Sequence, residues 1–234
     1  CRIVLTALFC ARVARPDCLW TVNVLAREVM RWNVACDKRL HRLMSYIHHT
    51  ADFSLVCFVG DAPEACRIVA FSDASYASDL RDSKSTSGGF ICLVGPNTFV
   101  PLTWMCKKQG AISHSSTEAE IIALDAILRM EGIPALVFWE SVLDTLCPIP
   151  LARGDSSRKA GGDSSARETD EIQKVLSMVD FVPPSLPPLT GRAQLIMLED
   201  NDAVIKMIIK GRSPAMRHVV RTQRVDLDFV FQVI

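Results

Sequence analysis

The chain has 234 residues, enough for one large domain or for one domain with flanking segments. Hydrophobic residues make up 49% of it, so it can bury a core, and it lacks the run of about 18 apolar residues that would cross a membrane. The 26 basic and 26 acidic residues balance, so net charge neither requires nor excludes a nucleic-acid partner.

The first 50 or so residues are predicted to be helical. Leu19, Val22, Leu25 and Val29 recur at the spacing of one helix face, and a similar pattern follows in "DKRLHRLMSYIHH". The opening stretch "CRIVLTALFCARVARPD" has no clean basic segment and no obvious cleavage site, so it is expected to be a core helix cut from a longer chain and not a signal peptide.

The cysteines are expected to be free. The nine of them are scattered through apolar runs and form no CxxC pair, which argues for buried thiols in a reducing compartment and against a zinc site.

A different pattern begins at Arg67. Three short strands are predicted at 67–72, 88–95 and 99–106, separated by turn-forming residues. Ser116 or Thr117 is expected to cap a helix that runs to about Leu143, with a kink or break near Gly132 and Pro134.

The segment 145–192 is rich in Ser, Gly, Asp and Pro and is expected to be a disordered insertion or linker. A fourth strand, "AQLIMLED", and two helical runs follow it. Three strands, a helix, a strand and further helices predict an α/β layer arrangement with the last strand beside the first.

Three acids stand at positions that this arrangement brings together. Asp73 ends the first strand, Glu120 lies in the first turn of the long helix, and Asp200 ends the fourth strand. Such a cluster repels itself unless a cation binds, and oxygen ligands favour Mg²⁺, with Mn²⁺ also possible. Two such ions about 4 Å apart support phosphodiester hydrolysis. Each acid also has an ordinary explanation: a turn residue, a charge at a helix start, or part of an N-cap pair.

Basic residues gather after the fourth strand. The stretch from Ala203 to Val225 contains no acid and holds Lys206, Lys210, Arg212, Arg217, Arg221 and Arg224. It is either a phosphate-binding face or a solvated helix surface.

Several motifs together resemble a known family. "SDASYASD", "SKSTSGG", "KKQ", "SSTEAEIIAL", "EDNDAVI" and "RTQRVDLDFVF" are similar, at these spacings, to the ribonuclease H domain of Ty1/copia-type retrotransposon Pol polyproteins. The upstream "ARPDCLWTVNVLAREV" is similar to the segment that connects the reverse transcriptase to that nuclease. The likeness covers about 1–144 and 193–234.

The resemblance implies a reverse-transcriptase connection at 1–62 and, at 63–234, a ribonuclease H-like mixed sheet flanked by helices. It implies an intracellular enzyme, in a virus-like particle or the nucleus, that cleaves the RNA strand of RNA–DNA hybrids beside the reverse-transcriptase portion of the same polyprotein. The metal-binding acids would be Asp73, Glu120 and Asp200. Ser115, Ser116 and Thr117, with Lys206, Lys210 and Arg212, would contact nucleic acid, which is recognised through its backbone and 2′-hydroxyls.

The chain also departs from the family pattern. The fifth strand and the last helix, which carries a fourth carboxylate, have no counterpart before Ile234, and Arg224 stands where the family usually has a histidine. The alternative is therefore a catalytically inactive ribonuclease H-like remnant that binds nucleic acid or only folds.

Overall fold

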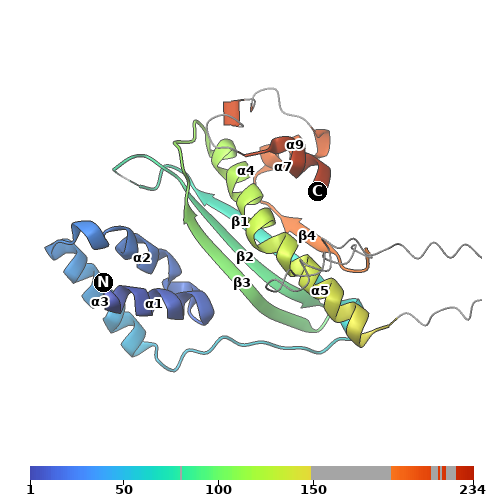
Figure 1. Ribbon diagram of the computed structural model, residues 1–234, viewed down its shortest axis with the longest axis horizontal. Coiled ribbons are helices and arrows are strands. Elements are labelled where there is room, and N and C mark those ends of the chain that lie inside the picture. The colour runs from blue at the N-terminus through green and yellow to red at the C-terminus, as the bar shows by residue number, and fades with distance from the viewer. Residues whose placement is uncertain (80, 149–190, 212–215, 217, 220–224) are drawn as a thin grey trace, which may run out of the picture.

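The computed structural model describes residues 1–79, 81–148, 191–211, 216, 218–219 and 225–234 (Figure 1). Most of the predicted insertion at 145–192 therefore lies outside the described residues. The elements are α1 (Arg2–Val13), α2 (Pro16–Arg27), α3 (Val34–His49), β1 (Arg67–Ser75), β2 (Thr86–Gly95), β3 (Thr98–Lys108), α4 (Ser116–Ile127), α5 (Ile133–Leu146), β4 (Leu195–Leu198), α7 (Asp202–Lys210) and α9 (Leu227–Val233).

The strands form one mixed sheet in the order β3-β2-β1-β4. The first three make an antiparallel meander, and β4 pairs in parallel with β1 from Ile68 opposite Leu195 to Phe71 opposite Leu198. The predicted placement of the fourth strand beside the first is confirmed, as is the mixed α/β class. This topology matches a ribonuclease H-like fold, with four strands in the described part of the chain.

One long, broken helix covers one face of the sheet (Figure 1). It consists of α4, a π-helical turn at Leu128–Gly132, and α5, which carries Pro134 in its first turn. The π turn sits where Pro134 cannot continue a regular hydrogen-bond ladder, so the predicted kink is confirmed. Ile127, Trp139 and Leu143 of this helix pack on Ile68, Ala70, Ile91 and Leu93 of β1 and β2 in one core cluster.

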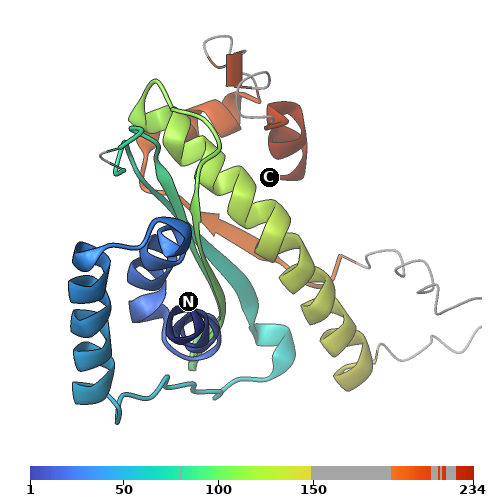
Figure 2. The same cartoon turned by 60° about the vertical axis from the view of Figure 1, so that its left-hand side comes forward.

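The helices α1 to α3 lie on the opposite side of the sheet (Figure 2). Their core of Val4, Leu19, Val22 and Leu25 extends to Trp104 of β3, whose indole N–H donates to the carbonyl of Ala11 at 2.8 Å. The N-terminal segment is thus helical as predicted, and it packs directly on the sheet. The division of the chain into 1–62 and 63–234 stays a prediction.

The C-terminal helices close the end of the sheet at which α4 begins (Figure 1). Val204 of α7 and Leu227 and Val230 of α9 are buried against Ile121 and Leu124 of α4. The start of α4 therefore lies between the sheet on one side and the C-terminal elements on the other.

All nine cysteines are free. Cys18, Cys36, Cys66 and Cys92 are buried, as expected for thiols in apolar runs, whereas Cys1, Cys10 and Cys57 are exposed. No helix in the described part of the chain is long and apolar enough to cross a membrane.

Candidate active site

Two of the predicted acids follow the paired segments of neighbouring strands. The β1–β4 pairing ends with Phe71 opposite Leu198, and Asp73 and Asp200 each come two residues later on these two chains. Because the strands are parallel, the two acids reach the same edge of the sheet. Asp73 is exposed and also lies opposite Gly88 of β2, which places no side chain beside it.

The third predicted acid, Glu120, reaches this edge from α4. Three alanines allow the helix to lie close to the strand, because Ala74 of β1 packs on Ala119 and Ala123 of α4. Glu120 is buried, and the backbone N–H of Ala74, the neighbour of Asp73, donates to its carboxylate. Glu120 therefore extends toward the strand end that carries Asp73.

The charges at this edge act strongly on Glu120. Burial raises the pKa of its carboxyl group, and the carboxylates of Glu199, Asp73 and Asp200 raise it further, to about 7. Among the described residues, no group hydrogen-bonds to Glu120 Oε2, which is buried. The site is thus a partly desolvated acidic cluster with an unsatisfied oxygen.

Glu199 belongs to this cluster, and the sequence reasoning missed it. Burial raises the pKa of Glu199, while the hydroxyl of Ser72, which donates to it at 2.7 Å, acts in the opposite direction. Of the neighbouring charges, that of Glu199 contributes most to the high pKa of Glu120. The sequence "LED" already places this second acid directly before Asp200, at the end of the fourth strand.

The alternation of side chains between the faces of a strand separates the predicted acids. Ser72 and Ala74 are buried beneath α4, whereas Asp73 is exposed and lines a cleft between α2 and the sheet together with Trp20 and Trp104. In the described part of the chain, the three acids are not among the groups whose ligand atoms all lie within 4.8 Å of one another. Asp73, Glu120 and Asp200 thus meet at one sheet edge and interact electrostatically, without forming a tightly closed group.

The family-like motifs meet in one buried hydrogen-bond network. The Gln109 side chain, from "KKQ", donates to Ser87 Oγ of "KSTSG" at 3.0 Å and to the Ala119 carbonyl of "STEAE" at 2.9 Å. Its side-chain oxygen accepts a hydrogen bond from Ser113 at 2.7 Å. Gln109 therefore fixes the start of α4, and with it Glu120, against the strands.

The residues before α4 are placed differently from the prediction in one respect. The N-cap is Ser115, whose hydroxyl oxygen accepts the Glu118 N–H at 3.0 Å, and not Ser116 or Thr117. A capping residue needs an extended backbone, which Ser115 has, whereas Ser116 and Thr117 already belong to the helix. Ser116 is exposed and Thr117 is half-buried.

The predicted basic residues follow the cluster along the chain. Lys206 and Lys210 are exposed on α7, where Lys206 forms an ion pair with Asp202. Arg212 lies outside the described residues, as do Arg217, Arg221 and Arg224.

A second group of basic residues was not predicted. Arg27 and Arg31, at and just beyond the end of α2, and Arg39 and Arg42 of α3 are exposed and line a cleft that the loop before β2 also borders. The lining of this cleft also includes the acids Asp17, Glu28, Asp79 and Asp82. The sequence shows these arginines, but only the packing of α2 beside α3 places them together.

The donor set of the acidic cluster suits a hard cation. It offers carboxylate oxygens only, and one of them, on Glu120, is buried and unsatisfied. Burial and then repulsion by the other carboxylates hold the pKa of Glu120 high. Oxygen donors of this kind are the ligands that Mg²⁺ takes in proteins. The residues present therefore fit Mg²⁺.

About half of the chain is similar in sequence to known transposon proteins. The chain is 30% identical over 121 residues to the putative transposon Ty5-1 protein YCL074W of Saccharomyces cerevisiae, covering 51% of this chain and 37% of that protein. It is 33% identical over 111 residues to the retrovirus-related Pol polyprotein from transposon RE2 of Arabidopsis thaliana, covering 45% of this chain and 7% of the polyprotein.

A third relative is shorter. The secreted RxLR effector protein 161 of Plasmopara viticola is 33% identical over 113 residues, which are 48% of this chain and 74% of that protein. No protein-family model and no solved structure matches the chain. The chain thus spans well under half of the length of the transposon proteins, to which about half of it is similar, and it belongs to the same sequence family as the Plasmopara viticola protein.

Proposed function

We propose that the chain is a ribonuclease H module of a retrotransposon Pol polyprotein, which hydrolyses the RNA strand of RNA–DNA hybrids with Mg²⁺. One observation carries the proposal: Glu120 is buried at the sheet edge with a pKa of about 7, raised by burial and by Glu199, Asp73 and Asp200. A cluster of this kind costs stability, and groups perturbed in this way are concentrated at binding and catalytic sites. The relationship to Pol polyproteins supports the same conclusion.

The acidic residues of the cluster would bind the metal. Asp73, Glu120 and Asp200 would hold Mg²⁺, with Glu199 as a further oxygen donor. Mg²⁺ bound there supplies activation of water and stabilisation of the leaving oxygen. The open position beside Gly88 leaves Asp73 accessible to a substrate phosphate.

The nucleic acid would lie along the two groups of exposed basic residues. The four arginines of the α2–α3 cleft are exposed and suited to phosphates, as are Lys206 and Lys210. Ser115, Ser116 and Thr117 offer hydroxyl donors at the start of α4. Contacts of this kind read the shape and backbone of a hybrid duplex and not its base sequence.

The polyprotein context is part of the proposal. The helices α1 to α3 would connect the module to the reverse-transcriptase portion, and the assembly would act inside the cell. These helices pack against Trp104 of the sheet, which supports a fixed orientation of this connection relative to the sheet.

The test is cleavage of a labelled RNA–DNA hybrid by the purified chain in Mg²⁺. Asp73→Asn and Asp200→Asn are expected to lower the rate at least about 100-fold, because removing even outer-shell partners of a metal costs up to that much. Asp202→Asn is the matched control, since Asp202 is exposed, lies two residues from Asp200, and forms a surface ion pair with Lys206. Equal cleavage by the parent and the Asp73→Asn variant would refute the assignment.

A second candidate is an inactive remnant that binds the hybrid or only folds. The observation that favours it is the open arrangement of the acids, which do not close to within 4.8 Å in the described residues. Binding of the hybrid without Mg²⁺-dependent cleavage, by a chain with intact circular dichroism, would establish this candidate and reject the first.

A further inference from the structure

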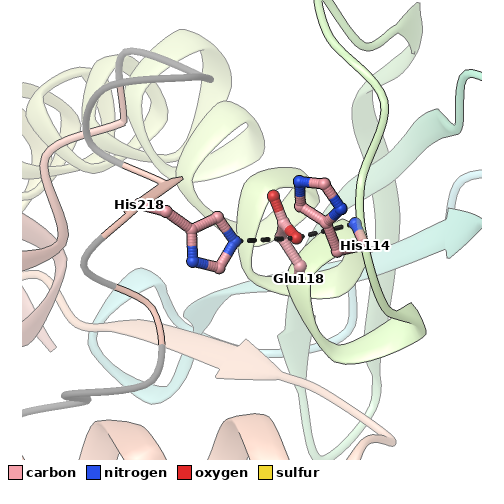
Figure 3. A group of neighbouring side chains, drawn as sticks. All are labelled: His114, Glu118 and His218. Carbon is pink, nitrogen blue, oxygen red and sulfur yellow. Dashed lines mark hydrogen bonds and ion pairs between the residues drawn. The ribbon is translucent and has the colours of Figure 1, made fainter.

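Three side chains outside the acidic cluster come together at the start of α4. The ligand atoms of His114, Glu118 and His218 all lie within 4.8 Å of one another, and Figure 3 shows both imidazole rings beside the Glu118 carboxylate. From this geometry we infer a zinc-binding site that joins α4 to the C-terminal part of the chain.

Glu118 is the centre of the group. Its side chain is 1% exposed, and its Oε2 accepts the backbone N–H of His114 at 2.7 Å and lies 3.2 Å from Nε2 of His218. Its Oε1 is buried, and no described group hydrogen-bonds to it. A buried carboxylate oxygen without a partner is costly, so this atom is suited to bind a cation.

Helix capping accounts for only part of this arrangement. A glutamate at the third helical position commonly accepts a backbone N–H from the residues before the helix, as Glu118 does from His114. That contact uses Oε2. It explains neither the unsatisfied Oε1 nor the two imidazole rings, whose centroids are 5.3 Å apart in an edge-to-face arrangement.

The geometry needs little adjustment to hold a metal. Zn²⁺ bonds nitrogen and oxygen ligands at about 2.0–2.1 Å, which places tetrahedral donors roughly 3.4 Å apart. Oε2 of the Glu118 carboxylate is already 3.2 Å from Nε2 of His218, and the unpartnered Oε1 belongs to the same carboxylate. His114 is exposed, so its ring can rotate by the remaining amount without disturbing the core.

The ligand chemistry selects zinc over magnesium. Two imidazoles and one carboxylate are the donors of well-known three-ligand zinc sites, whereas Mg²⁺ prefers oxygen and retains its waters. The site is thus chemically distinct from the oxygen-only cluster at Glu120. The absence of a CxxC pair argues against a cysteine-based zinc site, and this site contains no cysteine.

A metal here would hold together segments far apart in the chain. His218 and Glu118 are 100 residues apart. Val219, next to His218, is fully buried in the core that contains Ile121 and Leu124 of α4. Zinc would therefore fix the C-terminal part against the helix that carries Glu120.

The experiment is a titration of the chain with Zn²⁺ alone, followed by isothermal calorimetry and thermal unfolding. The exposed cysteines Cys1, Cys10 and Cys57 are replaced by serine in every protein, so that surface thiols do not bind the metal. The variants are His114→Ala, His218→Ala and Glu118→Gln. The control is His41→Ala, which removes an exposed histidine from α3.

The parent and the His41→Ala control are expected to bind one Zn²⁺ per chain and to melt at a higher temperature with zinc. Each of the three variants is expected to lose at least about tenfold in affinity and to show no zinc-dependent rise in melting temperature. Excess Mg²⁺ should not displace the zinc. The absence of stoichiometric binding by the parent, or unchanged affinity in His114→Ala, whose side chain is exposed and outside the core, would overturn the inference.

Discussion

Replacing Glu120 by glutamine is expected to stabilise the protein, although it removes a proposed catalytic group. The carboxyl group has a usual pKa of 4.5 and a pKa of about 7 in the folded chain. Between these values the folded chain binds more protons than the unfolded chain, so stability falls as the pH rises through this window and the loss is complete above it.

The size of the effect follows from these two values. A tenfold change in an ionisation constant corresponds to about 1.4 kcal/mol, so the ionised Glu120 lowers the free energy of unfolding by about 3 kcal/mol at pH 8. At pH 5 the same calculation gives less than about 1 kcal/mol. Glutamine has nearly the same shape, carries no charge, and can still accept the hydrogen bond from Ala74.

Urea denaturation of the parent and of Glu120→Gln at pH 5 and pH 8 measures this difference directly. Asp202→Asn, an exposed charge change, serves as the control and is expected to stay within about 0.5 kcal/mol of the parent at both pH values. Adding Mg²⁺ should narrow the gap between parent and variant at pH 8, because a bound cation offsets the repulsion. A variant less stable than the parent at pH 8, or equally stabilised at both pH values, would refute the reasoning.

Two further substitutions test how the site is held. Gln109→Leu leaves Ser87 and Ser113 without their buried partner, so a loss of about 2–4 kcal/mol is expected in urea denaturation, and a loss below about 0.5 kcal/mol would show that the network is not needed. Gly89→Ala is expected to cost about 1–3 kcal/mol, because its Cβ would lie 2.3 Å from Ile127 Cδ1. Adding Ile127→Val should recover part of that loss, and a double variant no better than Gly89→Ala would contradict the packing explanation.

The strand pattern was predictable because it depends on local rules. Apolar runs bounded by turn residues located β1 to β4, and the α/β layer arrangement expected from the order of elements placed β4 beside β1. The resulting register brings Asp73 and Asp200 to one edge. Pro134 likewise predicted the break in the long helix.

Other parts of the site depend on packing, which a sequence does not display. Glu199 joins the cluster because Ser72 and Glu120 lie on its side of the sheet. The Glu118–His218 contact joins residues 100 positions apart, and no local pattern signals it. The N-cap fell on Ser115 and not on its neighbours because consecutive Ser and Thr residues are equally good caps by composition, and only the backbone conformation separates them.

The indole of Trp104 has a practical consequence for anyone expressing this protein. A recombinant fragment that begins at residue 63 would strip the apolar cover from that ring and leave its N–H without the Ala11 carbonyl. Freshly uncovered aromatic surface of that kind promotes aggregation. Truncation at the predicted domain boundary is therefore a poor route to a soluble sample, and helices α1 to α3 should be kept in any preparation.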